Sequence, residues 1–229
     1  AAATGAKTFE LYGAGRTDAG VHALGQVAHL QLDVRTAGEA LRRQINDELP
    51  ADINILELVR APQRFHARHD AVARSYVYQI SRRRTAFAKP YVWWVRDDLC
   101  IDRIREAASM FVGLHDFRSF AATEPGESST RVQVDVVEIV EHGPLVLVRV
   151  QGSHFLWRMV RRLVGVMAAA GRGELEPADV ARMLTHESAV PAPLTAPSSG
   201  LFLERVVFRG DAAPLPLRPP VFSACPGSV

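Results

Sequence analysis

Residues 13–20 read Gly-Ala-Gly-Arg-Thr-Asp-Ala-Gly, a glycine-rich stretch that discriminates between the folds open to this chain. A dinucleotide-binding loop needs the pattern G-x-G-x-x-G followed by a helix whose N-terminus holds the pyrophosphate. Here the third glycine comes two residues late, and the residues that follow, VHALGQVAHL, are interrupted by Gly25 and alternate as a strand does. The stretch therefore argues against a nucleotide-cofactor oxidoreductase built on a Rossmann fold.

The same glycines suit a tight loop that presents Asp18 beside Arg16. Glycine lets the backbone approach a ligand closely and adopt conformations denied to other residues. A carboxylate held near a guanidinium stays ionised, so that it can act as a nucleophile or a base. The competing interpretation is a turn aspartate that caps its own backbone, since aspartate is a common turn residue. The local pattern alone leaves both interpretations open.

Composition and charge narrow the class of protein. The chain has 229 residues, 48% hydrophobic and 23% charged, which is typical of a globular protein. It has no apolar run long enough for a membrane span and no signal-peptide pattern, so we expect a cytoplasmic location. Residues 60–105 carry a net charge of +7, against −5 for the remainder. Such clustering favours a surface that faces a polyanion.

The periodicity of apolar residues predicts strands and helices in both halves of the chain. Strands are expected at 7–12, 25–32, 53–59, 73–80, 132–140, 145–150 and 201–208, and helices at 37–49 (capped by Thr36), 102–112, 155–170 and 177–184. Tyr76 and Tyr78 share one face of their strand, and residues 81–85, SRRRT, form a basic loop tip. The mixture indicates an α+β protein, with a loosely docked Pro-rich tail at 210–229.

Five sequence blocks, in order, resemble the TruA family of tRNA pseudouridine synthases. They are GAGRTDAGVHALGQVAH, RFHARHDAVARSYVYQI, GLHDFRSF, HFLWRMVRRLVGVM and APSSGLFLERVVF, which together cover residues from about 10 to 208. The resemblance implies the pseudouridine synthase fold: two ferredoxin-like α/β lobes with joined, mostly antiparallel sheets, flanked by helices around a central catalytic cleft. We expect lobes at 1–100 and 101–209, followed by the tail.

The resemblance also implies an activity and a set of site residues. The family isomerises uridine to pseudouridine in the anticodon stem-loop of tRNA as a homodimer, without a cofactor or metal. Asp18 matches the catalytic aspartate, Tyr76 the tyrosine that stacks on the uracil, and Arg161 the arginine that pairs with the carboxylate. Residues expected to contact RNA are Arg16, His22, Arg68, Arg74, Arg82, Arg83, Arg84 and His115.

Two further expectations concern histidine and the N-terminus. His66-x-x-His69 has metal-ligand residue types, but no third ligand has suitable spacing, so we expect no metal site.

The family normally has a strand and much of a helix before the first block, and this sequence does not contain them. We therefore expect an N-terminally truncated chain with an exposed sheet edge. The alternative to an active enzyme is a catalytically impaired RNA-binding fragment.

Overall fold

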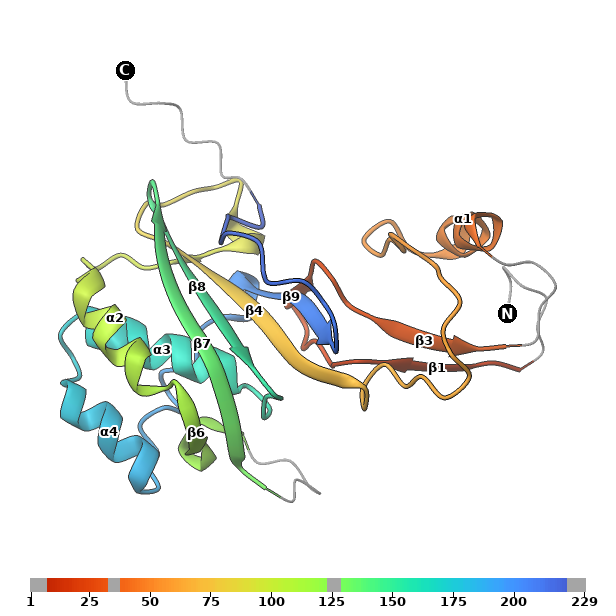
Figure 1. The fold of residues 1–229 in the computed structure, drawn as a ribbon. Coiled ribbons are helices and arrows are strands. Elements are labelled where there is room, and N and C mark those ends of the chain that lie inside the picture. Colours follow the sequence, from red (N-terminus) through yellow and green to blue (C-terminus); the bar gives the residue numbers. More distant parts are fainter. Residues whose placement is uncertain (1–7, 33–37, 123–128, 222–229) are drawn as a thin grey trace. The chain divides into compact units, whose positions relative to one another are not determined.

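The computed structural model describes residues 8–32, 38–122 and 129–221, and the chain forms two compact units (Figure 1). Unit 1 comprises Ala1–Arg16 and Val27–Ala71, and unit 2 comprises Thr17–Gln26 and Val72–Val229. The fold is α+β with a mostly antiparallel sheet flanked by helices, as expected. No helix within these ranges has the length and apolar character that a membrane crossing requires.

The units do not follow the predicted division at residue 100. Strand β4 spans Ala71–Ser81, and its residues from Arg74 to Ser81 pair antiparallel with β8, Leu145–Gly152. Residues from the predicted first lobe therefore share a sheet with residues from the predicted second lobe. In addition, the segment Thr17–Gln26 belongs to unit 2 although the residues on both sides of it belong to unit 1.

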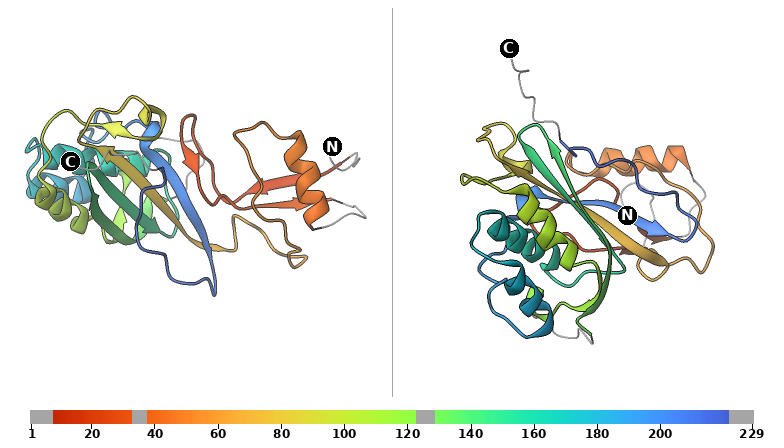
Figure 2. Two further views of the ribbon diagram at one scale, coloured as in Figure 1. Left: turned by 90° about the horizontal axis from the view of Figure 1, so that it is seen from above. Right: turned by 60° about the vertical axis from the view of Figure 1, so that its left-hand side comes forward.

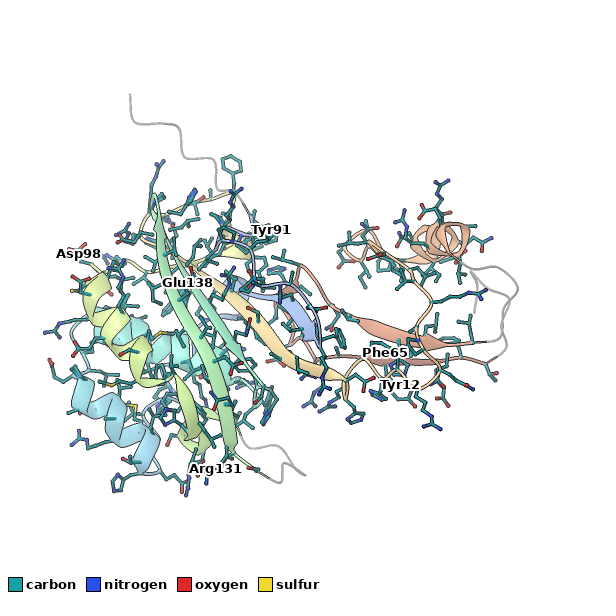
Figure 3. All side chains as sticks on the ribbon, viewed as in Figure 1. Tyr12, Phe65, Tyr91, Asp98, Arg131 and Glu138 are labelled. Carbon is teal, nitrogen blue, oxygen red and sulfur yellow. The ribbon has the colours of Figure 1, made fainter. Side chains whose placement is uncertain are left out.

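Unit 1 contains a two-stranded ribbon and one helix. β1, Glu10–Gly13, pairs antiparallel with β3, Ala28–Gln31, and α1 spans Glu39–Glu48. Figure 3 labels Tyr12 and Phe65, two of the aromatic side chains on this ribbon and the segment that follows α1. The predicted cap Thr36 lies outside the described residues, and Gly38 is the residue that precedes α1.

The strand predicted at 53–59 is wrong. Asn46 of α1 holds the backbone of Ile55 at both ends, because its side chain accepts from the Ile55 N–H at 2.8 Å and donates to the carbonyl at 3.0 Å. Arg42 donates to the same carbonyl at 2.8 Å. The backbone N–H and carbonyl of Ile55, which a strand would use for pairing, are thus taken by helix side chains, and Leu56 and Val59 stay exposed.

Unit 2 is built on a sheet with the strand order β2-β9-β4-β8-β7-β6, with β5 beside β4. The remaining strands are β2 (His22–Ala23), β5 (Trp93–Trp94), β6 (Gly113–Asp116), β7 (Arg131–His142) and β9 (Leu201–Phe208). β7 and β8 form the predicted antiparallel pair, and β2 runs parallel to β9. The short β2 is how the segment Thr17–Gln26 joins the sheet.

Three helices pack against one face of this sheet (Figure 2). They are α2 (Ile101–Met110), α3 (Met159–Gly171) and α4 (Pro177–Thr185). The core between them includes Phe111, Phe117, Met159 and Leu163, none of which is exposed. Helix α3 begins at Met159 rather than at 155 as predicted, because Arg158 has left-handed backbone angles (φ 61°, ψ 5°) that a right-handed helix cannot contain.

The opposite face of the sheet is covered in part by the C-terminal segment, in which residues 210–216 are exposed and Leu217 is docked. Leu217 is buried against Val77 and Leu147. The Arg149 guanidinium donates to the Leu215 carbonyl at 2.9 Å. Burial of an apolar side chain together with a charge-assisted hydrogen bond fixes this segment on the sheet.

Candidate active site

Asp18 lies in a tight turn whose shape depends on Gly20. The Val21 N–H donates to the Asp18 carbonyl at 2.9 Å, and Gly20 has a φ of 78°, the pattern of a type II turn. A Cβ on Gly20 would lie 2.7 Å from the Ser198 Oγ. The turn therefore needs glycine both for its backbone angles and for its close packing on residues 198–200.

The Asp18 side chain is directed at α3 and the segment before it. Arg161 Nη1 lies 3.8 Å from Oδ2, and the Trp157 indole N–H donates to Oδ1 at 3.3 Å. The turn bond uses the main-chain oxygen of Asp18 and leaves the carboxylate for these two partners. This geometry supports a carboxylate held for chemistry over one that caps its own turn.

Arg161 is positioned by the loop that leads into β9. Its Nε donates to the Ala196 carbonyl at 2.7 Å, and the Ala196 N–H donates to the Arg161 carbonyl at 3.0 Å. Burial lowers the pKa of Arg161, while nearby Tyr78 and Asp18 oppose the shift. A guanidinium is nonetheless always charged in proteins. Arg161 thus supplies a fixed positive charge beside the Asp18 carboxylate.

Tyr76 and Tyr78 share one face of β4, as predicted, but have different surroundings. Tyr78 is fully buried, and its hydroxyl donates to the Pro197 carbonyl at 2.7 Å, which is a structural role. Tyr76 is half-buried, with its ring edge-on to Phe155 at 5.2 Å. Burial raises the pKa of Tyr76, Arg74 lowers it and the charge of Asp18 raises it. Tyr76 therefore differs from Tyr78 in having a ring that solvent reaches in part.

The predicted basic loop carries two kinds of arginine. Arg82 is fixed on the turn between β7 and β8, where it donates to Glu141 at 2.9 Å and to the Gly143 carbonyl at 2.8 Å. Arg83 and Arg84 are exposed, and the Arg84 guanidinium lies 5.4 Å from the centre of the Trp94 ring. Arg83 and Arg84 are thus the side chains of this loop most accessible to a phosphate.

The other predicted RNA contacts are distributed over the chain. Arg74 on β4 donates to the Ser153 carbonyl at 3.0 Å. The His22 ring lies between Tyr91 (labelled in Figure 3) and Phe202, with a nitrogen 2.8 Å from the Pro90 carbonyl. His115 is on β6, at the opposite end of the sheet order from β2, and bonds the Val112 carbonyl at 3.0 Å. Both rings have evident structural contacts, and their contact with RNA stays a prediction.

Arg16 and Arg68 belong to unit 1, together with a cluster of histidines. The His66 ring centre is 4.6 Å from that of His29 and 4.1 Å from that of His69. Within the described residues no group of three or more histidine, cysteine or carboxylate side chains has an arrangement that could hold a metal ion. A hollow of about 230 Å³ between α2 and the start of α4, lined by Arg103 and Glu106 among others, contains none of the predicted site residues.

Trp157 is the neighbour of Asp18 that the sequence prediction missed. It lies inside the block HFLWRMVRRLVGVM, four residues before Arg161. Had the helix begun at 155 as predicted, that spacing would have placed both residues on one helix face. In the structure Trp157 lies before the helix, and a non-helical turn brings it to the same carboxylate as Arg161. Helical spacing would therefore have predicted the correct pair of residues without the correct backbone.

Comparison with known proteins gives one consistent result. A family model described as tRNA pseudouridine synthase matches residues 107–209. The chain is 39% identical over 198 residues to tRNA pseudouridine synthase A of Pseudothermotoga lettingae, covering 85% of this chain and 81% of that protein. It is 38% identical over 199 residues to tRNA pseudouridine synthase A of Anaplasma phagocytophilum (86% and 81%), and 35% identical over 204 residues to tRNA pseudouridine synthase A 2 of Bacillus cereus (88% and 83%).

Proposed function

The chain belongs to the tRNA pseudouridine synthase family, and we propose that it isomerises uridine to pseudouridine in tRNA with Asp18 as its nucleophile or base. The observation that carries the assignment of Asp18 is its geometry. Arg161 and Trp157 each engage a different oxygen of its carboxylate. Both possible roles use an ionised carboxylate, and this arrangement sets a positive charge and an N–H donor beside its two oxygens.

The reaction moves atoms within one nucleotide and needs no redox partner. The N1–C1′ bond breaks and its electron pair stays on the uracil. The base turns, C5 bonds to C1′, and the C5 proton leaves while N1 gains one. Asp18 either attacks C1′ to give a glycosyl ester or removes a ribose proton to give a glycal. Both routes need an ionised carboxylate and a detached base held in place.

Tyr76 is the residue that we propose holds the detached base. Its half-buried ring, on the face of β4 that it shares with Tyr78, offers an aromatic surface for stacking. Because burial raises its pKa, the phenol is neutral at pH 7 and is suited to donate or accept a hydrogen bond. A neutral phenol is a poor base, so its pKa favours the stacking and hydrogen-bonding role over removal of the C5 proton.

Access to the ribose requires the target nucleotide to leave the base stack. Flipping a base costs a few kcal/mol, and least where the base is unpaired or at a helix end, which favours a target in the anticodon stem-loop. Phosphate contacts from Arg83 and Arg84 would position the RNA without reading its sequence. We also propose that the protein acts as a homodimer. We propose a cytoplasmic location because its substrate is tRNA.

The test of the assignment is Asp18→Asn assayed on unmodified tRNA labelled with tritium at uridine C5. We expect tritium release to fall by about 10³-fold or more with tRNA affinity retained, because the amide cannot attack or accept a proton. Asp135→Asn removes an exposed carboxylate on β7 and serves as the matched control. Turnover by Asp18→Asn at the rate of the control would refute the role of Asp18.

The RNA surface is tested separately by the double variant Arg83→Ala/Arg84→Ala. Loss of two phosphate contacts should weaken tRNA binding and reduce the slope of log affinity against log salt by about 2, while sparing the rate at saturating tRNA. Arg103→Ala, on α2, is the control because its ion pair is with Glu176, the residue before α4. An unchanged salt slope would discredit this surface.

A further inference from the structure

The segment between β8 and α3 has a conformation that calls for an explanation. Arg158 is the one non-glycine residue with a positive φ in the described part of the chain. A side chain with a Cβ is strained there, and such strain persists only where surrounding contacts impose it. At Arg158 the strain lies directly before the first residue of α3 and directly after Trp157.

The backbone on both sides of Trp157 is firmly anchored. Leu156 and Met159 are buried in the core, and the Met159 N–H donates to the Leu156 carbonyl at 3.0 Å. The Ala122 N–H donates to the Trp157 carbonyl at 2.9 Å. These contacts fix the place from which the Trp157 side chain extends, and the left-handed Arg158 lets the chain turn into α3 immediately afterwards.

The Trp157 ring is held from outside as well. The exposed Arg158 guanidinium lies over it, 4.6 Å from the ring centre, within the range of a cation–π contact. The strained residue therefore clamps the ring whose N–H faces Asp18.

Arg161 alone does not define the orientation of the Asp18 carboxylate. Its nearest contact with that group is 3.8 Å, and its Nε is committed to the Ala196 carbonyl. Rotation of an aspartate carboxylate about χ2 meets only a soft barrier. A second contact on the other oxygen is needed to fix the plane, and the Trp157 indole N–H makes it at 3.3 Å. Because indole only donates and does not titrate, it orients the carboxylate without neutralising it.

We propose that Trp157 is a positioning residue for Asp18, and that Arg158 positions Trp157 in turn. The inference rests on the proposed function, since it assigns the indole N–H the task of aiming the Asp18 carboxylate at the ribose. Trp157 touches neither the ribose nor the base in this scheme. Its effect is on the rate of the chemical step and leaves tRNA affinity unchanged.

The decisive variant is Trp157→Phe, which keeps an aromatic ring under Arg158 and removes the N–H. We expect the single-turnover rate at saturating tRNA to fall about 10-fold, the lower end for loss of a hydrogen bond to a charged group, with an unchanged Kd for tRNA. Trp93→Phe is the matched control, because Trp93 packs edge-on against Tyr78 at 6.3 Å. A rate for Trp157→Phe within twofold of the control overturns the inference.

A spectroscopic measurement tests the contact without relying on activity. The indole N–H resonance of Trp157, identified by its absence in Trp157→Phe, should move in Asp18→Asn and stay in place in Asp135→Asn. If the chemical shift of this resonance is the same in Asp18→Asn as in the unaltered protein, the inference is overturned, even where Trp157→Phe is inactive through misfolding. The two proposals fail separately: full turnover by Asp18→Asn removes the proposed role of Asp18, whereas an inactive Asp18→Asn with a normal Trp157→Phe removes only that of Trp157.

Discussion

Unit 1 and unit 2 differ sharply in how much apolar surface they bury. Unit 2 packs a continuous core between its sheet and α2, α3 and α4. Unit 1 buries Leu41 and two alanines among its described apolar residues, while Leu11, Leu56 and Val59 are each more than 60% exposed. Asp18 precedes most of unit 1 in the sequence, yet its carboxylate partners, Trp157 and Arg161, belong to unit 2. The geometry around Asp18 therefore depends on the better-packed unit.

Substitutions in the two units test this difference in packing, and we expect the largest loss of stability for Gly165→Ala in α3 of unit 2. A Cβ at Gly165 would lie 1.7 Å from the Leu194 carbonyl oxygen, so the loop that carries Ala196 must move. We expect a loss of about 3 kcal/mol in the free energy of unfolding, at the upper end for overpacking. Urea denaturation followed by far-UV circular dichroism measures it in both units, since α1 belongs to unit 1 and α3 to unit 2.

The matched control is Gly15→Ala in unit 1, where a Cβ would meet no atom within 4 Å. Its expected effect on stability is below about 0.5 kcal/mol. Equal losses from the two substitutions would contradict the difference in packing between the units.

A smaller effect is expected from charge burial. Arg149 is 4% exposed and bonds both Glu204 and Glu138, whose side chains are 19% and 39% exposed; Figure 3 labels Glu138 on β7. Arg149→Gln leaves these carboxylates without their cation and should cost about 2 kcal/mol, less than a fully buried pair because Glu138 reaches solvent. The comparison is Arg43→Gln in unit 1, which breaks an exposed pair with Glu39 and should cost less than about 0.5 kcal/mol. Thermal melts of both variants measure the two losses of stability, and the loss for Arg149→Gln should be the larger.

The smallest expected effect is a dependence of stability on pH in unit 1. Partial burial, together with the charges of His69 and His29, holds the pKa of His66 below 6.5, and Asp70 opposes the shift. The unfolded chain therefore binds this proton more readily, so the stability of unit 1 should fall as pH drops through 6.5. Amide hydrogen exchange of α1 between about pH 7 and pH 5 measures it. His66→Gln should flatten the profile, and an equally steep profile in that variant would exclude His66 as the cause.

The sequence predicted local elements well where one strong periodicity acted alone. β4, β7, β8, β9, α2 and α4 lie within a few residues of their predicted ranges, because alternation or amphipathicity is uninterrupted there. Residues 53–59 have the same apolar pattern, but their backbone is bonded by α1 side chains, which periodicity does not reveal. The start of α3 was misplaced because left-handed Arg158 leaves no trace in a hydrophobic stripe.

The residues of the candidate site were predictable in part, because they lie in sequence blocks that resemble a known family. Sequence blocks indicated Asp18, Tyr76 and Arg161, and the structure brings all three into one unit. The unit boundary was not predictable, because it depends on the short pairing of β2 with β9, two segments that lie far apart in the sequence. The proline content of the tail predicted loose docking, but it does not reveal that a single leucine and one carbonyl group are what hold the tail on the sheet.

The docking of the Leu217 side chain and the Leu215 carbonyl has a consequence for the order of folding during synthesis. Both residues follow every strand of the sheet in the sequence and so leave the ribosome after all of them. Until they emerge, Arg149 lacks its carbonyl partner and the apolar cluster around Val77 lacks one of its buried side chains. The far side of the sheet therefore matures last, and a nascent chain stopped at residue 210 would present that side to chaperones.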